Sequence, residues 1–234
     1  MNPFLATVLT FAAAIAWLRV MDFFAHKGWI ESRLSRKIIH IGTGSIYVLC
    51  WLMFPDVWYA RYLAMLVPLL ITVQFILVGM GVVKDEASVT AMSRTGDRRE
   101  ILRGPLFYGI IFVVMTLVYW NTSPIGMTAL MLMCGGDGLA DITGRGIKSA
   151  KLPWNKGKSV AGSLGMFIGG WVLAAFIIGV FVGAGIFAGP FAGYLLPITL
   201  IAIAGTAVES LPLPEVDNIT ITLAAVLLGY LFFR

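Results

Sequence analysis

Long runs of apolar residues, interrupted by short polar segments, make up most of this chain. Several runs approach the roughly 20 residues that an α-helix needs to cross a bilayer. Hydropathy predicts eight spans, at about residues 4–20, 38–54, 60–82, 104–120, 125–142, 161–182, 186–204 and 218–233. We therefore expect an all-α fold, a polytopic transmembrane helix bundle of about eight spans. The first run should be a retained helix and not a cleaved signal peptide.

The composition agrees with a membrane setting. Of the 234 residues, 59% are hydrophobic and only 12% are charged, whereas about a quarter of the residues of a soluble domain are charged. Because no polar segment is long enough to build a separate soluble core, residues 1–234 should form a single domain. The two cysteines, Cys50 and Cys134, lie in apolar runs and offer neither a disulfide framework nor metal-ligand spacing.

The basic residues are distributed unevenly between the predicted spans. Segments 19–37, 84–103 and 145–158 each hold five, together fifteen of the 17 Lys and Arg. With eight spans, all three segments fall on one side of the membrane. The positive-inside rule makes that side cytoplasmic, so that both termini should lie on the opposite side.

Acidic residues gather at the same predicted face. Asp137 and Asp141 follow the apolar run 127–133, and the segment 205–217 holds Glu209, Glu215 and Asp217. A carboxylate near lipid is costly and usually functional. Asp137 and Asp141 are four residues apart and share a helix face, and the glycines at 135, 136 and 138 would let another backbone or a phosphate come near.

These carboxylates suit a hard divalent cation. Mg²⁺ commonly takes one or two carboxylates together with substrate phosphates. We therefore expect a Mg²⁺ site built from Asp137, Asp141, Glu209 and Asp217. The plainer alternative is that the acids pair with nearby arginines or reach to the interface, and it is the better reading for Glu215, which follows Pro214 in a solvated loop.

A second polar group lies in KLPWNKGKSVAGSLG, residues 151–165. Lys156, Lys158 and Ser159 stand just before an apolar helix, whose free N–H groups and partial positive charge attract anions. A polyphosphate cradle and a simple interfacial anchor with a serine cap are both consistent with this pattern. Gly157-Lys158-Ser159 resembles the end of a Walker A loop, but Leu152 stands where the leading glycine is required, so a P-loop is excluded.

The third group is RKIIH, which opens the second span. Arg36 and Lys37 are either interfacial anchors or ligands of a phosphate. His40 lies one turn deeper, where it would contact a phosphate, an alcohol or a neighbouring helix.

Carboxylates for Mg²⁺ beside cations for phosphates indicate phosphoryl or nucleotidyl transfer, which depends mainly on positioning and charge neutralisation. The acceptor should be a lipid, and nothing indicates a nucleic-acid partner. A transporter is a remote alternative, because no internal repeat is evident and the charges crowd one face.

Five segments together resemble the plant and cyanobacterial phytol kinases, of a polyprenol kinase family that includes farnesol and dolichol kinases. They are RKIIH, LRGPLFYG at 102–109, SPIGMTALMLMCGGDGLADITGR at 123–145, KLPWNKGKSVAGSLGMF at 151–167 and VESLPLPEVDNITI at 208–221. The resemblance implies an integral membrane kinase that moves the γ-phosphate of CTP onto an isoprenoid alcohol, phytol being favoured, for tocopherol and phylloquinone synthesis.

Under this resemblance, Asp141, Glu209 and Asp217 are expected metal ligands, and Asp137 is a further ligand or the base that takes the alcohol proton. The triphosphate would be held by basic and polar residues of two segments, Arg145, Lys151, Asn155, Lys156, Lys158 and Ser159 in one and Arg36, Lys37 and His40 in the other. The chain departs from the family pattern at Val216, where relatives often carry another aspartate, and at Lys148, where they usually carry glycine.

A cytidylyltransferase acting on a lipid phosphate would use the same pocket and stays an alternative. Nothing in the sequence separates CTP from other nucleotides, and the oligomeric state is open.

Overall fold

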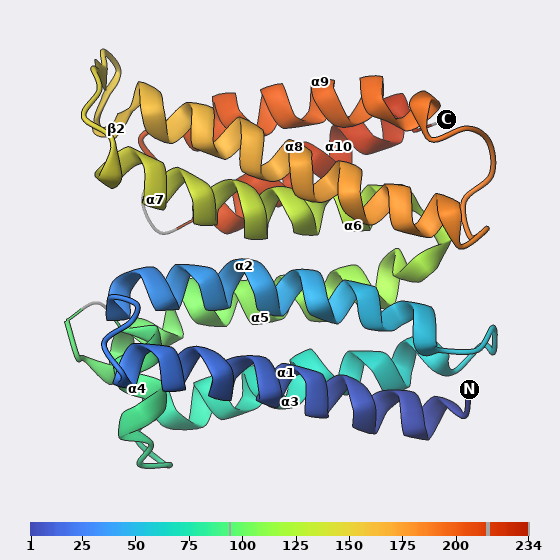
Figure 1. Cartoon of the computed structure of the whole chain (residues 1–234), viewed down its shortest axis with the longest axis horizontal. Coiled ribbons are helices and arrows are strands. Elements are labelled where there is room, and N and C mark those ends of the chain that lie inside the picture. The colour runs from blue at the N-terminus through green and yellow to red at the C-terminus, as the bar shows by residue number, and fades with distance from the viewer. Residues whose placement is uncertain (94, 214–215, 234) are drawn as a thin grey trace.

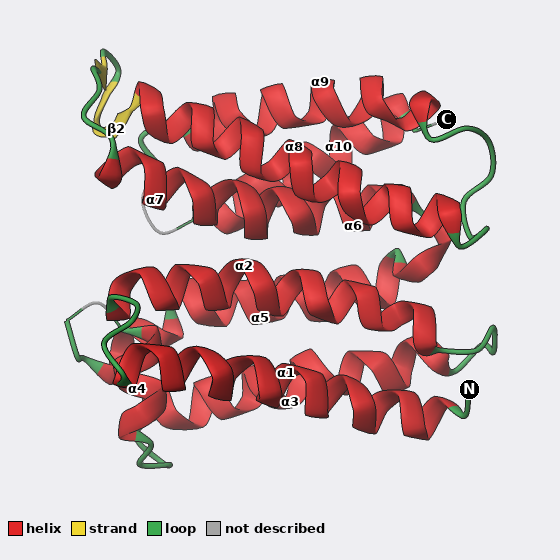
Figure 2. Ribbon diagram, in the orientation of Figure 1, coloured by secondary structure: helices red, strands yellow, loops and turns green. Residues whose placement is uncertain are grey.

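The computed structural model describes residues 1–93, 95–213 and 216–233, which fold almost entirely into helices lying lengthwise beside one another (Figures 1 and 2). The expected all-α fold is confirmed. Arg94, of the basic segment 84–103, and Glu215 lie outside the described residues, as does the last residue, Arg234.

The long segments alternate in direction, and both termini lie at one end of the bundle (Figure 1). They are α1 (Pro3–His26), α2 (Ser32–Cys50), α3 (Ala60–Met80), α5 (Gly104–Val118), the run of α6 (Pro124–Met131), η4 (Leu132–Gly136) and α7 (Asp137–Gly146), then α8 (Val160–Gly183), α9 (Ala192–Glu209) and α10 (Asp217–Phe232).

Six spans in the described part of the chain are long and apolar enough to cross a membrane. They comprise α1, α3, α8, α9, the stretch Arg98–Val118 and the stretch Pro124–Gly146. The two other lengthwise helices fall short for different reasons: α2 begins with the polar sequence SRLSRK, and α10 has only 16 residues. The prediction of about eight spans is therefore approximate, since six of the eight lengthwise segments of the described chain meet the criteria of length and hydropathy.

The predicted span 186–204 and the predicted loop 205–217 both differ from the structure. Gly185 and Gly189 have φ of 75° and 84°, a left-handed backbone that ends α8 and forms a turn before α9. As a result α9 begins at Ala192 and continues to Glu209, which is helical and not a loop residue.

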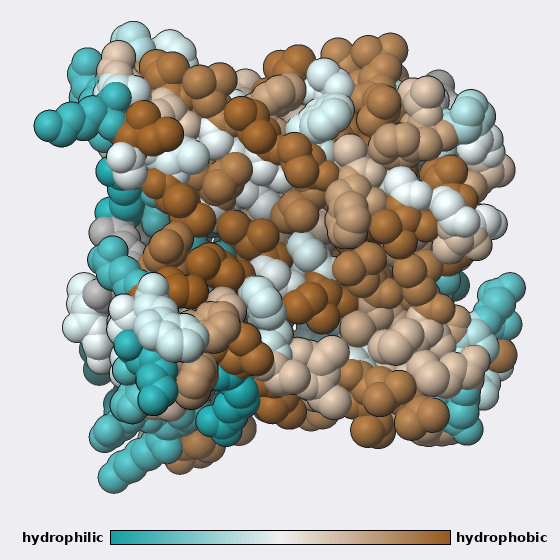
Figure 3. Space-filling view, viewed as in Figure 1, coloured by the Kyte–Doolittle hydropathy of each residue, from teal (hydrophilic) through white to brown (hydrophobic). Residues whose placement is uncertain are grey.

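Short elements fill the ends of the bundle. The turn η1 (Trp51–Met53) follows α2, and η3 (Trp120–Thr122) follows α5. The other end carries α4 (Glu86–Met92), η2 (Arg98–Leu102) and an antiparallel hairpin of β1 (Lys151–Leu152) and β2 (Asn155–Ser159). The sequence pattern predicted no strand there. In Figure 3 hydrophilic residues gather at the hairpin end and apolar residues cover the middle of the visible face.

The helices pack as two groups, one from each half of the chain (Figure 1). In the first group α1 packs on α2 and α3, and α3 packs on α5. In the second group α8 packs on η4, α7 and α9, while α10 packs on α9 and α6. The groups meet where α2 contacts η4 and α7, and where α5 contacts α6 and α10.

The α6–η4–α7 span lies at the centre of this arrangement. Residues 125–136 are all buried, because helices from both groups surround them. A helix that is apolar on every side is typical of such a central position. Asp137 follows this buried stretch directly, just past the middle of the span Pro124–Gly146, and Asp141 lies one helical turn nearer its polar end.

Glycines allow α8 to lie very close to this central span. A Cβ at Gly165 would collide with Thr143 Oγ1 and approach Leu139 O to 2.8 Å, and one at Gly135 would approach Gly169 O to 2.7 Å. Small residues spaced four apart, such as Gly165 and Gly169, predict a close helix contact, and the structure confirms it at this pair. The spacing of 179 and 183 marks such a contact only in part, since Gly183 faces open space.

Candidate active site

The central helix changes its geometry immediately before Asp137. Residues 132–136 form a π-helix, which widens the turn, and Asp137 opens α7 directly after it. Such π-helical turns occur frequently at functional sites. The glycines at 135 and 136 accommodate α8, and Gly138 accommodates Ile41 of α2. The sequence analysis expected these glycines to admit either another backbone or a phosphate. In the structure they admit neighbouring helices.

Asp137 meets two of the three polar residues of RKIIH. Lys37 Nζ lies 3.2 Å from Asp137 Oδ2, and His40 Nε2 lies 3.6 Å from the same oxygen. His40 also contacts the carbonyl of Met133, at 3.4 Å, in the π-helical turn. Asp137, Lys37 and His40 keep 14–21% of their side-chain surface exposed, so this group is sheltered but accessible.

Tyr108 supports His40 from α5, a role that the sequence analysis missed. Its hydroxyl donates a hydrogen bond of 2.8 Å to His40 O and lies 3.3 Å from Cys134 Sγ. The rings of Tyr108 and His40 are 4.4 Å apart. Tyr108 belongs to the LRGPLFYG segment on which the family resemblance rests, and this was the available signal.

Lys158 gathers the other two expected metal ligands. Its ammonium group pairs with Glu209 Oε1 and lies 3.3 Å from Asp217 Oδ2. Three separate elements thereby meet at one point: Lys158 is in β2, Glu209 ends α9 and Asp217 begins α10. Burial alone would lower the pKa of Lys158, but the hydrogen bond to Glu209 and the charges of Glu209, Asp217 and Asp137 raise it above its usual value. The Lys158 group therefore lies within the electrostatic reach of Asp137.

The two groups together carry more negative than positive charge. Asp137, Glu209 and Asp217 face the two lysines, Lys37 and Lys158. Glu209 is only 4% exposed, and its second oxygen, Oε2, is buried without a hydrogen-bond partner among the described residues. A buried carboxylate oxygen normally has a partner, so this site has both the charge and the free ligand atom for a further cation.

The expected four-carboxylate metal centre is not assembled in the structure. No group of three or more His, Cys, Asp or Glu side chains within the described residues is placed to hold a metal ion. Asp141 pairs with Arg145 at 2.5 Å, one helical turn along α7. Glu209 and Asp217, bridged by Lys158, nonetheless fit Mg²⁺, because this ion often takes two protein carboxylates and completes its shell with phosphates and water.

Ser159 and Asn155 have structural partners. The Ser159 hydroxyl caps α8 by accepting a hydrogen bond from Gly162 N at 3.3 Å. Asn155 donates from its amide to the carbonyls of Ser210 and Leu211, both at 3.1 Å. The indole of Trp154 donates to Ser210 Oγ at 3.2 Å. The hairpin is thus fastened to the end of α9, and this attachment holds Lys158 beside Glu209.

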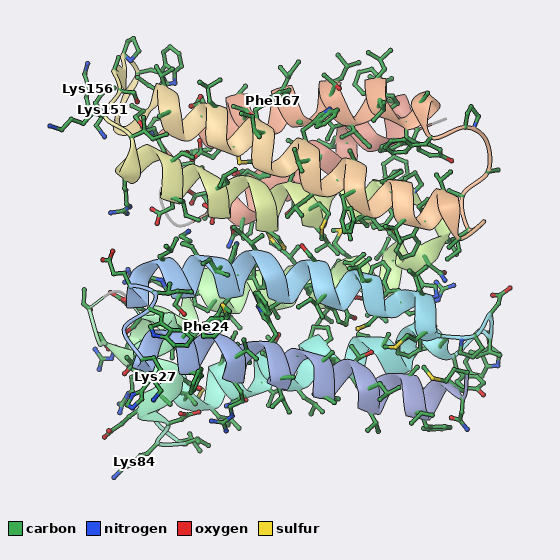
Figure 4. The ribbon with its side chains drawn as sticks, in the orientation of Figure 1. Phe24, Lys27, Lys84, Lys151, Lys156 and Phe167 are labelled. Carbon is green, nitrogen blue, oxygen red and sulfur yellow. The ribbon has the colours of Figure 1, made fainter. Side chains whose placement is uncertain are left out.

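The other expected phosphate ligands lie outside these two groups. Lys151 and Lys156 extend from the hairpin at the end of the bundle, the same end where Lys27 and Lys84 lie (Figure 4). Arg145 is 54% exposed in its side chain. Arg36 donates to the carbonyl of Ser93 at 2.9 Å, which ties α2 to the segment after α4. Arg145, Lys151 and Lys156 therefore form a cationic rim at the end of the bundle, whereas Lys37 and Lys158 are partly buried.

The arrangement as a whole suits the transfer of a phosphoryl group. It offers a sheltered carboxylate beside a histidine, lysines for phosphate oxygens and two further carboxylates for a cation. Charge neutralisation of this kind supplies most of the catalysis of phosphoryl transfer.

Comparisons with known proteins agree with this chemistry. The chain is 40% identical over 230 residues to a probable chloroplastic phytol kinase of Triticum aestivum, which covers 97% of this chain and 77% of the relative. It is 41% identical to a probable chloroplastic phytol kinase of Zea mays over 97% of this chain and 76% of the relative. A chloroplastic farnesol kinase of Arabidopsis thaliana is 38% identical over 96% of this chain and 74% of its own length. No family model and no solved structure matches.

Proposed function

The chain belongs to the family of phytol and farnesol kinases, and we propose that it transfers the γ-phosphate of a nucleoside triphosphate to an isoprenoid alcohol. CTP is the proposed donor and phytol the proposed acceptor. The observation that carries this proposal is the meeting of Asp137 with Lys37 and His40, next to Lys158 with Glu209 and Asp217.

In the proposed reaction the alcohol oxygen attacks the γ-phosphorus while the bond from that phosphorus to the β–γ bridging oxygen breaks. The products are the prenyl monophosphate and the nucleoside diphosphate. Asp137 accepts the hydroxyl proton, since it is the sheltered carboxylate next to Lys37 and His40. Lys37 and Lys158 hold phosphate oxygens in line, and the rim formed by Arg145, Lys151 and Lys156 attracts the nucleotide.

Glu209 and Asp217 are the proposed ligands of Mg²⁺, which when bound neutralises charge on the β- and γ-phosphates. The unpartnered oxygen of Glu209 supports this assignment. Asp141 could join only after leaving Arg145, so we assign it a secondary position in the site.

The apolar tail of the acceptor needs a surface that faces the membrane core. An open groove between α8 and α9 begins at the hairpin and is lined by Leu152, Val160, Ser163, Leu164, Phe167, Ile203 and Thr206; Figure 4 labels Phe167 on α8. Thr206 lies one helical turn before Glu209, so the groove leads toward the charged end. We propose it as the place of the prenyl tail.

The proposed setting is a membrane whose cytoplasmic or stromal side faces the hairpin end. The positive-inside distribution of Lys and Arg supports this orientation, and the relatives named above are chloroplastic.

The deciding experiment incubates the purified protein with phytol, geranylgeraniol and farnesol and with each of four labelled nucleoside triphosphates. A phosphorylated alcohol together with a nucleoside diphosphate supports the kinase. Pyrophosphate release in a parallel incubation with a prenyl monophosphate as acceptor would instead identify a cytidylyltransferase. Movement of a ligand across vesicle membranes without nucleotide turnover would identify a transporter.

A further inference from the structure

The position of Lys158 defines a cation site that already contains a cation. The ammonium group of this residue touches Glu209 Oε1 and Asp217 Oδ2, two carboxylates from different helices. An ammonium group and a metal ion both satisfy such a pair, but the ammonium group carries a single charge. Lys158 therefore stands where the metal proposed above would have to bind.

The neutralisation by Lys158 is incomplete. Glu209 is buried, and its Oε2 has no hydrogen-bond partner among the described residues. Asp137 lies near enough to influence Lys158, and its own nearest cation is Lys37. Glu209 Oε2 and the excess negative charge around Lys158 are therefore available to a cation of higher charge.

Lys158 can leave this position without a change in the fold. It lies on a short hairpin, its side chain is 28% exposed, and four methylene groups separate its charge from the backbone. The backbone of the hairpin meanwhile stays attached through Asn155 and Trp154 to the end of α9. Rotation of the side chain alone is enough to move the ammonium group.

We propose that Lys158 is a built-in counter-cation that competes with the metal and moves to a phosphate when the metal and nucleotide bind together. The inference rests on the proposed function, since it needs a metal–nucleotide ligand. Metal alone must displace Lys158 and leave it without an anionic partner, whereas metal with nucleotide supplies that partner. Metal and nucleotide therefore bind cooperatively, and each raises the affinity for the other by the same factor.

The first test measures the binding of Mn²⁺ to the purified protein in detergent, without nucleotide. The electron paramagnetic resonance signal of free Mn²⁺ gives the unbound concentration at each point of a titration. Lys158→Met should bind Mn²⁺ at least about tenfold more tightly than the wild type, because the competing charge is gone. Lys148→Met, which removes an exposed lysine from the same end of the molecule, should change the affinity much less. Adding Glu209→Gln to Lys158→Met should abolish the gain.

An Mn²⁺ affinity of folded Lys158→Met that equals or falls below that of the wild type would overturn the proposal. Because this variant leaves Glu209 without a partner and could fail to fold, a second measurement uses the wild type. Amine acetylation read by mass spectrometry should label Lys158 several-fold faster with Mn²⁺ alone, and slower again when a non-hydrolysable nucleotide is added. Lys148 is the internal reference, and constant labelling of Lys158 under saturating Mn²⁺ contradicts the inference.

Neither measurement depends on turnover. If the protein phosphorylates prenols but neither the Mn²⁺ affinity nor the acetylation rate changes, only the role of Lys158 is disproved and the proposed function stands. Mn²⁺ binding that responds to Lys158→Met in a protein that phosphorylates no alcohol would instead disprove the proposed function.

Discussion

Asp137 lies at a turn of the central helix and is also the carboxylate to which we assign proton transfer. It begins α7 after the π-helical turn, and its carboxylate faces Lys37 and His40 of α2. A carboxylate in such a position is stabilised by its neighbours and still reachable by a substrate. Its replacement by an uncharged side chain of the same shape therefore separates chemistry from packing.

Asp137→Asn should lower the turnover number by at least about a hundredfold, since general base catalysis contributes on the order of 10²–10⁴-fold. The protein should still elute as a single folded species in detergent, because the amide keeps the shape of the side chain. Turnover is measured as phosphorylated prenol per minute at saturating substrates. Asp56→Asn, an exposed aspartate between η1 and α3 at the opposite end of the bundle, is the control and should keep normal turnover. Near-normal turnover of Asp137→Asn would remove this residue from the mechanism.

Tyr108 offers a second test at the same scale. Tyr108→Phe deletes the hydroxyl that donates to His40 O but keeps the ring against the imidazole. We expect a loss of about 1 kcal/mol in the stabilisation of this contact, which appears as a fall in turnover of several-fold with an unchanged KM for nucleotide. A raised nucleotide KM with normal turnover would place Tyr108 at the nucleotide and not behind His40.

At the scale of elements, the close contact between α7 and α8 joins the helix that Asp137 opens to the helix that follows Lys158. Gly165→Ala would push a methyl group against Thr143 and the carbonyl of Leu139. Overpacking of this kind typically costs about 1–3 kcal/mol, so the thermal midpoint in detergent should fall by several degrees. Gly183→Ala, on the same helix but facing open space, should change it little. Equal midpoints for both variants would show that the α7–α8 contact tolerates a wider spacing.

The hairpin is the element that positions Lys158, and Asn155 is its main attachment. Asn155→Ala removes two hydrogen bonds to the end of α9, each worth about 1 kcal/mol. We expect the KM for nucleotide to rise by about tenfold while turnover at saturation changes by less than about threefold. A loss of turnover with an unchanged KM would mean that Asn155 acts on the transferred group and not on the hairpin.

The sequence was informative about elements where a physical pattern repeats over many residues. The apolar runs predicted the helices, and the glycine spacing at 165 and 169 predicted a close contact, because both depend on local composition. The end of α9 was not predictable in this way, since the turn at Gly185 and Gly189 shifts the helix toward Glu209. Pairing between helices was harder to predict. Asp141 and Arg145 pair within α7 at a spacing of four residues, but the meeting of Asp137 with Lys37 depends on how α2 packs against α7.

At the scale of the whole molecule, β2 and the helix ends that carry Glu209 and Asp217 lie at the end of the bundle opposite to the two termini (Figure 1). The site needs residues from both groups of helices: Lys37 and His40 come from the first, and Asp137, Lys158, Glu209 and Asp217 come from the second. Any movement between the groups would alter the distance between Asp137 and Lys37. In a membrane, the hairpin end of the bundle is open to nucleotide from one side only.

This orientation gives the last prediction, made with one introduced cysteine at a time and a membrane-impermeant maleimide. The native Cys50 and Cys134 are buried and should label slowly. Lys84→Cys places a thiol at the end that carries the charged site (Figure 4), and Asp56→Cys places one at the opposite end. In intact bacterial cells expressing the protein, Asp56→Cys should label at once, whereas Lys84→Cys should label only after the membrane is permeabilised. The reverse pattern would put the site on the outer face, where nucleoside triphosphates are scarce, and would contradict both the charge argument and the proposed donor.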